Sequence, residues 1–141
     1  MAAPPRTINA GTFFLTAITY NRRRLFQVTA NASLFIETLQ HYRVEGFYKL
    51  YAFVVMPDHV HLLLTTENLA RAMQRIKGGF SHSIASSSPI WQRGFTDHLV
   101  LNRKQFEIRR DYIHQNPVQE RLVQRAEDYP HSSAYCPTSS H

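Results

Sequence analysis

Residues 48–65 read YKLYAFVVMPDHVHLLLT, and this stretch decides the fold. Two largely apolar runs, 48–56 and 59–65, are separated only by Pro57 and Asp58. Proline and aspartate are common turn formers, so the spacing predicts two antiparallel strands joined as a hairpin.

Further elements are expected on both sides of this hairpin, from hydrophobic spacing, capping residues and chain breakers. Pro117 is expected to end the last long helix, because proline disfavours a helical conformation in the residue before it. The order of elements is that of an α+β, ferredoxin-like fold, an antiparallel sheet with packed helices, extended by an additional C-terminal helix. The expected elements are a strand at 12–20, a helix from Asn31 or Ser33 to about 44, the hairpin, a helix after Asn68, a strand at 98–101, a helix from 103 to about 116 and a shorter helix at 119–125.

Composition limits the class of protein. A chain of 141 residues with 43% hydrophobic residues predicts one folded domain over 1–141, with a loose arm at 1–10 and a frayed tail at 135–141. The single cysteine excludes a module held by internal disulfides. No apolar run approaches a membrane span, so we expect a cytoplasmic, nucleoid-associated protein. The net charge of +6 favours an anionic partner, with nucleic acid first.

The pair His59 and His61 stands at the start of the second hairpin strand. Side chains alternate along a strand, so both imidazoles share one face, about 6.5–7 Å apart along the chain, and can converge on one metal ion. Two ligands leave a catalytic site incomplete. The alternative is two histidines on a solvent-facing sheet surface.

A second pair, Tyr112 and Asn116, is four residues apart on the last long helix and so shares a helix face. The phenol is a potential nucleophile and the amide oxygen a potential metal ligand. The alternative is a core aromatic residue and an ordinary C-terminal helix residue. Taken together with the two histidines, the pair favours attack on a phosphodiester with a covalent link to tyrosine, a chemistry suited to strand transfer.

Three segments resemble a known family. VMPDHVHLLL at 55–64 is similar to the His-hydrophobe-His signature of single-tyrosine HUH transposases. WQRGFTDH at 91–98 and YIHQNPV at 112–118 resemble REP-associated tyrosine transposases within that class, and 71–77 and 129–134 fit the pattern more loosely. The resemblance covers roughly 13–134. It departs from the family at 119–121 and at His131, which concerns local packing or DNA contacts.

The resemblance implies a nuclease core that nicks and rejoins single-stranded or hairpin DNA, including REP-type palindromes, through a covalent 5′-phosphotyrosine intermediate. It implies Tyr112 as the nucleophile, His59 and His61 as metal ligands, and Asn116 as the third ligand. The metal implied is Mg²⁺ or Mn²⁺. Relatives of this class act as a monomer or a homodimer.

Basic residues form clusters that we expect to contact DNA phosphates, which gives affinity and salt dependence but no sequence choice. Trp91 is expected to pack rather than to stack on a base. Asp58 is interpreted as a turn residue, and Asp97 with His98 as a pair that supports a ligand imidazole. The predicted DNA-binding residues are Arg22, Arg23, Arg24, Arg71, Arg75, Lys77, Arg109 and Arg110.

Two alternatives to this transposase hypothesis stay open. A non-catalytic, domesticated protein that binds single-stranded nucleic acid would use the same sheet but would not need Tyr112 and the two histidines together. A metal-dependent phosphodiesterase that activates water would retain cleavage without Tyr112, whereas the covalent mechanism would not.

Overall fold

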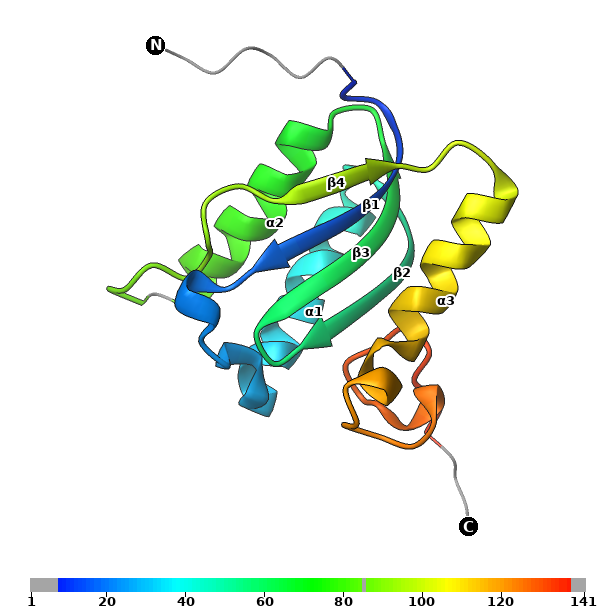
Figure 1. Cartoon of the computed structure of the whole chain (residues 1–141). Coiled ribbons are helices and arrows are strands. Elements are labelled where there is room, and N and C mark those ends of the chain that lie inside the picture. Colours follow the sequence, from blue (N-terminus) through cyan, green and yellow to red (C-terminus); the bar gives the residue numbers. More distant parts are fainter. Residues whose placement is uncertain (1–7, 85, 138–141) are drawn as a thin grey trace.

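The computed structural model describes residues 8–84 and 86–137, and its four strands form one antiparallel sheet in the order β2-β3-β1-β4 (Figure 1). This order, with helices between the strands, confirms the predicted α+β, ferredoxin-like arrangement. Three short 3-10 turns lie outside it, at Tyr20–Arg22, Leu25–Gln27 and Ala126–Asp128. In chain order the main elements are β1 (Gly11–Ile18), α1 (Thr29–Val44), β2 (Lys49–Met56), β3 (His59–Thr66), α2 (Leu69–Ile84), β4 (Thr96–Leu99) and α3 (Arg103–Gln119).

The hairpin is present as predicted. β2 and β3 pair antiparallel, with Met56 opposite His59 across the turn at Pro57 and Asp58. β1 then pairs along the whole of β3, so that Ile18 lies opposite His59. The hairpin residues therefore sit in the centre of the sheet rather than at an edge.

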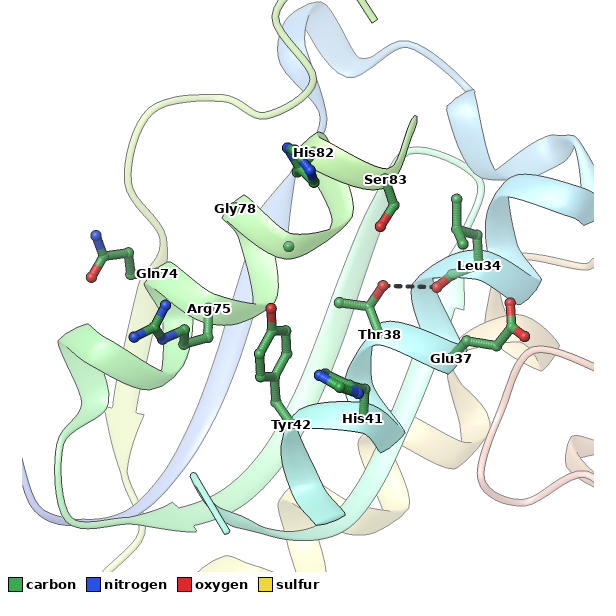
Figure 2. Close-up of a pocket in the computed structure, with 11 residues that line it drawn as sticks. Leu34, Glu37, Thr38, His41, Tyr42, Gln74, Arg75, Gly78, His82 and Ser83 are labelled. Atoms are coloured by element: carbon green, nitrogen blue, oxygen red, sulfur yellow. Dashed lines mark hydrogen bonds between the residues drawn. The ribbon is translucent and has the colours of Figure 1, made fainter. Parts of the chain in front are cut away.

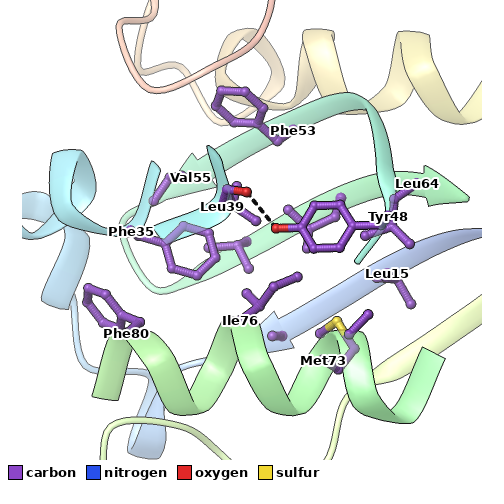
Figure 3. Close-up of a cluster of buried hydrophobic side chains, with 14 of the residues drawn as sticks. Leu15, Phe35, Leu39, Tyr48, Phe53, Val55, Leu64, Met73, Ile76 and Phe80 are labelled. Carbon is purple, nitrogen blue, oxygen red and sulfur yellow. Dashed lines mark hydrogen bonds between the residues drawn. The ribbon is translucent and has the colours of Figure 1, made fainter. Parts of the chain in front are cut away.

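Alternating side chains give the sheet two different faces. Phe13 and Leu15 of β1 point into the larger core, which α1 and α2 cover (Figure 3). Phe14 points to the other face, into a smaller core completed by Ile113 of α3. Burial of these two apolar layers is the main contribution to stability. On the second face α3 packs together with Tyr129 from the segment that follows it.

The larger core also holds Trp91, as predicted. Its ring lies within 6 Å of the rings of Phe26, Phe35 and Phe80, and its indole N–H donates to the backbone carbonyl of Lys77. The WQRGF segment is thereby fixed to α2.

Helices α1 and α2 pack closely on the sheet and leave between them an open groove of about 700 Å³ (Figure 2). Tyr42 of α1 reaches across to α2, where a Cβ on Gly79 would lie 2.8 Å from the tyrosine ring. Gly79 therefore permits a close approach of the two helices. Gly78, beside it, has no atom within 4 Å of the same position.

Several predicted boundaries, and the predicted helix at 119–125, were wrong. Helix α1 begins at Thr29, because Asn31 donates its side-chain N–H to the carbonyl of Leu25 instead of capping the helix. Strand β4 begins two residues earlier than predicted, in register with β1. Pro117 lies inside α3, and the helix ends at Gln119 before Arg121 adopts a left-handed conformation (φ 60°). That turn also explains why no helix forms over 119–125.

The expected terminal arms lie partly outside the described residues, which exclude 1–7 and 138–141. Asn9 is held against the start of α2, where its carbonyl accepts from the N–H of Leu69 and its side chain donates to Asn68. Asn68 caps α2 as predicted, accepting from the N–H of Arg71. Within the described residues, no helix combines the length and apolarity needed to cross a bilayer.

Candidate active site

The two histidines lie on the sheet face that α3 covers only in part. Their rings are 4.8 Å apart between centroids and inclined at 74°, so both project from β3 into the same space, as the strand alternation predicts. His61 lies opposite Thr16 of β1 and Val54 of β2. His59 sits at the hairpin turn, beside Asp58.

One nitrogen of each imidazole is occupied by a neighbour. His59 donates from Nδ1 to Asp58 Oδ1 (2.6 Å), and the other oxygen of that carboxylate accepts from Arg22 (3.2 Å). Nδ1 of His61 shares a hydrogen bond with Thr16 Oγ1 (2.9 Å). These contacts fix both rings through Nδ1 and leave Nε2 of each as the nitrogen that could bind a metal, an arrangement typical of ligand histidines.

The electrostatics of this pair suit ligation. Burial lowers the pKa of His61 to about 3, and the charges of His59 and Arg109 act in the same direction, against a hydrogen bond to the backbone of Leu15. His61 is therefore neutral near pH 7 and keeps its lone pair. Burial alone would raise the pKa of Asp58, but its contacts with His59 and Arg22 outweigh burial and hold the pKa below its ordinary value.

The ring of Tyr112 stands edge-on against the rings of His61 and Phe14. Its ring centroid is 5.4 Å from that of His61 and 5.8 Å from that of Phe14. Its side of α3 faces the sheet, yet the residue is 42% exposed. The phenol thus lies beside the histidines and within reach of a substrate.

Asn116 follows Tyr112 by one helical turn and is 6% exposed. Its Oδ1 is a buried acceptor without a hydrogen-bond partner in the described structure, an arrangement that costs about 1–3 kcal/mol when nothing compensates it. In the described part of the chain, no three acidic, histidine or cysteine side chains cluster around a possible metal position. An amide oxygen without a partner is chemically suitable as a third donor in addition to two imidazole nitrogens.

The predicted DNA-binding residues separate into two groups by location. Arg22 and Arg109 lie at the site, the first through Asp58 and the second over the ring of Phe14 at 4.6 Å. Arg71 and Arg75 instead lie over Phe47, beyond the far end of β3.

The remaining basic side chains have local partners. Arg23 donates to the carbonyl of Pro89, Arg24 to Gln27, and Arg110 to Asp111. Lys77 donates to the carbonyls of Gln92 and Gly94, and burial lowers its pKa. It therefore holds the WQRGF segment in place.

Sequence reasoning missed the neighbours that orient the histidines. Asp58 lies in the turn, as interpreted, but its carboxylate also contacts His59. Asp97 lies on β4. Thr16 and Phe14 reach the site only through the pairing of β1 with β3. The adjacency of Asp58 to His59 in the sequence was the one signal that could have identified a supporting residue.

Comparison with known proteins gives consistent matches. The family model "Transposase IS200 like" matches residues 12–116. The REP-associated tyrosine transposase of Escherichia coli is 31% identical over 130 residues, covering 89% of this chain and 78% of the relative. A solved REP-associated tyrosine transposase bound to a REP hairpin superposes with a TM-score of 0.81 at 28% identity, over 94% of this chain and 82% of that one. A Deinococcus radiodurans structure, 17% identical with a TM-score of 0.53, shares the fold.

Proposed function

The chain belongs to the family of IS200-like transposases, and on that premise we propose that it nicks and rejoins single-stranded or hairpin DNA through Tyr112. The observation that carries this proposal is the contact of Tyr112 with His61, which brings a nucleophile from α3 to the histidine pair of β3.

The proposed reaction is an exchange of phosphate esters. Tyr112 Oη attacks the phosphorus and forms a 5′-phosphotyrosine while the bond to the 3′ oxygen breaks. The phenol gives up its proton, and the departing 3′ oxygen gains one. Attack by a second 3′ hydroxyl reverses these changes and joins new ends, because the ester bond to tyrosine retains the energy of the original bond.

The residues present fit a divalent cation, Mg²⁺ or Mn²⁺. We propose Nε2 of His59, Nε2 of His61 and Oδ1 of Asn116 as its ligands, because two of these atoms are freed by fixed Nδ1 contacts and the third is orphaned. When bound, the ion would polarise a phosphate oxygen and offset its charge. Asp58 and Thr16 would keep the imidazoles oriented whether or not the ion is present.

The proposed substrate is a DNA hairpin of the REP type. The solved relative with a TM-score of 0.81 binds such a hairpin, and this chain carries a net charge of +6 suited to a polyanion. Work on chromosomal hairpins would associate the protein with the nucleoid, as a monomer or a homodimer.

The experiment that tests the proposal compares the natural chain with Tyr112→Phe. The natural chain should form a denaturation-resistant adduct with a labelled hairpin, and Tyr112→Phe should form none while it binds the same hairpin with nearly equal affinity. Cleavage that persists in Tyr112→Phe would replace the covalent mechanism with attack by water. A covalent adduct in that variant would remove Tyr112 from its role.

A further inference from the structure

We propose that Arg109 is a catalytic residue that binds the phosphate attacked by Tyr112. This inference rests on the proposed function, because it assigns to Arg109 the phosphate that Tyr112 is proposed to attack.

The position of Arg109 separates it from its neighbours. Its guanidinium lies over the ring of Phe14, 4.6 Å from the centroid, and Tyr112 stands edge-on to the same ring at 5.8 Å. His61 stacks on that ring as well, at 5.3 Å and 21°. Phe14 is thus a buried platform around which the cation, the nucleophile and a proposed ligand are arranged.

The spacing along α3 supports the same arrangement. Arg109 precedes Tyr112 by three residues, so the two side chains are neighbours on one helix face. The two groups are therefore placed on one rigid element.

The guanidinium of Arg109 is available to a ligand. In residues 8–84 and 86–137 it forms no ion pair with a carboxylate, whereas Arg103 pairs with Glu107 and Arg110 with Asp111 on the same helix. Arg109 also lines an open pocket of about 470 Å³ between β4 and α3, beside His98 and Gln105. A phosphate can reach it from solvent.

The chemistry of the step requires a group of this kind. The negative charge on the phosphate oxygens repels an incoming phenolic oxygen, and it rearranges as one P–O bond forms and the other breaks. A guanidinium donates two parallel hydrogen bonds to a phosphate and keeps its charge throughout. The cation–π contact with Phe14 positions the guanidinium before the substrate arrives, and such preorganisation is a main source of electrostatic catalysis.

The test measures the rate of adduct formation at Tyr112 and hairpin affinity for Arg109→Gln, Arg109→Lys and the matched control Arg103→Gln. Arg103 is 90% exposed and lies on the same helix, so its variant loses the same charge away from the site. Arg109→Gln should slow adduct formation about 100-fold, with hairpin affinity reduced less than about tenfold. Arg109→Lys should recover part of the rate, and Arg103→Gln should stay within about threefold of the natural chain.

A second measurement isolates the phosphate contact without chemistry. A neutral methylphosphonate at the mapped cleavage junction should weaken binding to Tyr112→Phe, but it should not weaken binding further to Tyr112→Phe/Arg109→Gln. This arm measures binding alone, so it stays informative where Arg109→Gln reacts too slowly to follow.

The outcomes separate the two proposals. An adduct in the natural chain, with Arg109→Gln reacting within about threefold of it, would overturn the role of Arg109 and leave the proposed function intact. Equal sensitivity of both proteins to the methylphosphonate would overturn it as well. No adduct in the natural chain would remove the proposed function, and this inference with it.

Discussion

His59 and His61 are held by different neighbours, and this difference sets what each residue contributes. His59 depends on a carboxylate at the surface of the turn, Asp58, whereas His61 is buried and held by Thr16. The orientation of His59 therefore depends on one polar side chain, Asp58, which can be replaced without creating a cavity in the core.

Replacement of that support tests its role. Asp58→Asn should weaken Mn²⁺ binding about 10- to 100-fold, because the amide loses the charge that orients and polarises the imidazole. Isothermal titration of the metal-free protein measures this, with Asp128→Asn as a control whose carboxylate pairs with Arg125 instead. A Mn²⁺ titration of Asp58→Asn that matches the natural chain would show that Asp58 does not support a ligand.

Asn116 gives a prediction with opposite signs for stability and metal binding. Asn116→Leu removes a buried acceptor that has no partner, so the metal-free variant should be as stable as the natural chain or about 1 kcal/mol more stable. Mn²⁺ should raise the melting temperature of the natural chain, since a ligand that binds only the folded state stabilises it. The same concentration should leave Asn116→Leu nearly unchanged.

Thermal melts of both proteins with and without Mn²⁺ measure the stability of the metal-free state and the stabilisation by the metal. An equal upward shift in the natural chain and in Asn116→Leu would exclude Asn116 as a ligand. A large loss of stability in the metal-free variant would instead mean that the amide has a structural role.

The sequence was sufficient to nominate the chemical groups, since His59, His61, Tyr112 and Asn116 follow local periodicities of two and four residues. The contact between the histidine pair of β3 and the Tyr112–Asn116 pair of α3 was not predictable from spacing alone. It depends on the contact of α3 with the central strands, which joins residues about fifty positions apart. The shared chemistry of the two pairs suggested this contact, and the resemblance of whole motifs implied it.

At the level of elements, α1 and α2 depend on a close approach at one glycine. Gly79→Ala should destabilise the fold, because the new methyl group would lie 2.8 Å from the ring of Tyr42 and 3.3 Å from Thr38. Gly78→Ala adds the same group in open space on the same helix. It should stabilise the fold by about 0.5–1 kcal/mol through helix propensity.

Urea denaturation of the two variants compares these adjacent positions directly. Stabilisation of both by similar amounts would mean that Tyr42 moves aside at little energetic cost. Destabilisation of Gly78→Ala would show that the groove between the helices is narrower than the structure places it.

Helices and strands were predicted correctly where local sequence signals agreed. Their bounds were wrong where contacts between distant parts of the chain set them. The hairpin was placed correctly, since Pro57 and Asp58 separate two continuous strand patterns. The start of β4 was predicted too late, because it is set by pairing with β1. α3 continues past Pro117 to Gln119, and the N–H of Glu120 still bonds to the carbonyl of Asn116.

For the whole molecule, the net charge of +6 predicts hairpin binding that weakens steeply with salt. The logarithm of affinity should fall linearly with the logarithm of salt concentration, and each lost phosphate contact should flatten the slope by about 0.7–0.9. Arg71→Gln and Arg75→Gln, far from Tyr112, test whether DNA extends to that end of the sheet. Arg125→Gln, paired with Glu127 and Asp128, is the control.

Slopes unchanged in Arg71→Gln and Arg75→Gln would restrict the DNA path to the end of the sheet near the histidines. A hairpin-binding constant of the natural chain that does not change with salt concentration would contradict any contact with DNA phosphates.

The proposed reaction attaches DNA covalently to Tyr112 of this chain. It is tested by incubating the protein with labelled hairpin oligonucleotides and Mn²⁺, separating the products on a denaturing gel and mapping the modified peptide by mass spectrometry. We expect a protein–DNA adduct whose phosphate is on Tyr112. Cleaved DNA with no adduct, or an adduct on any other residue, would contradict it.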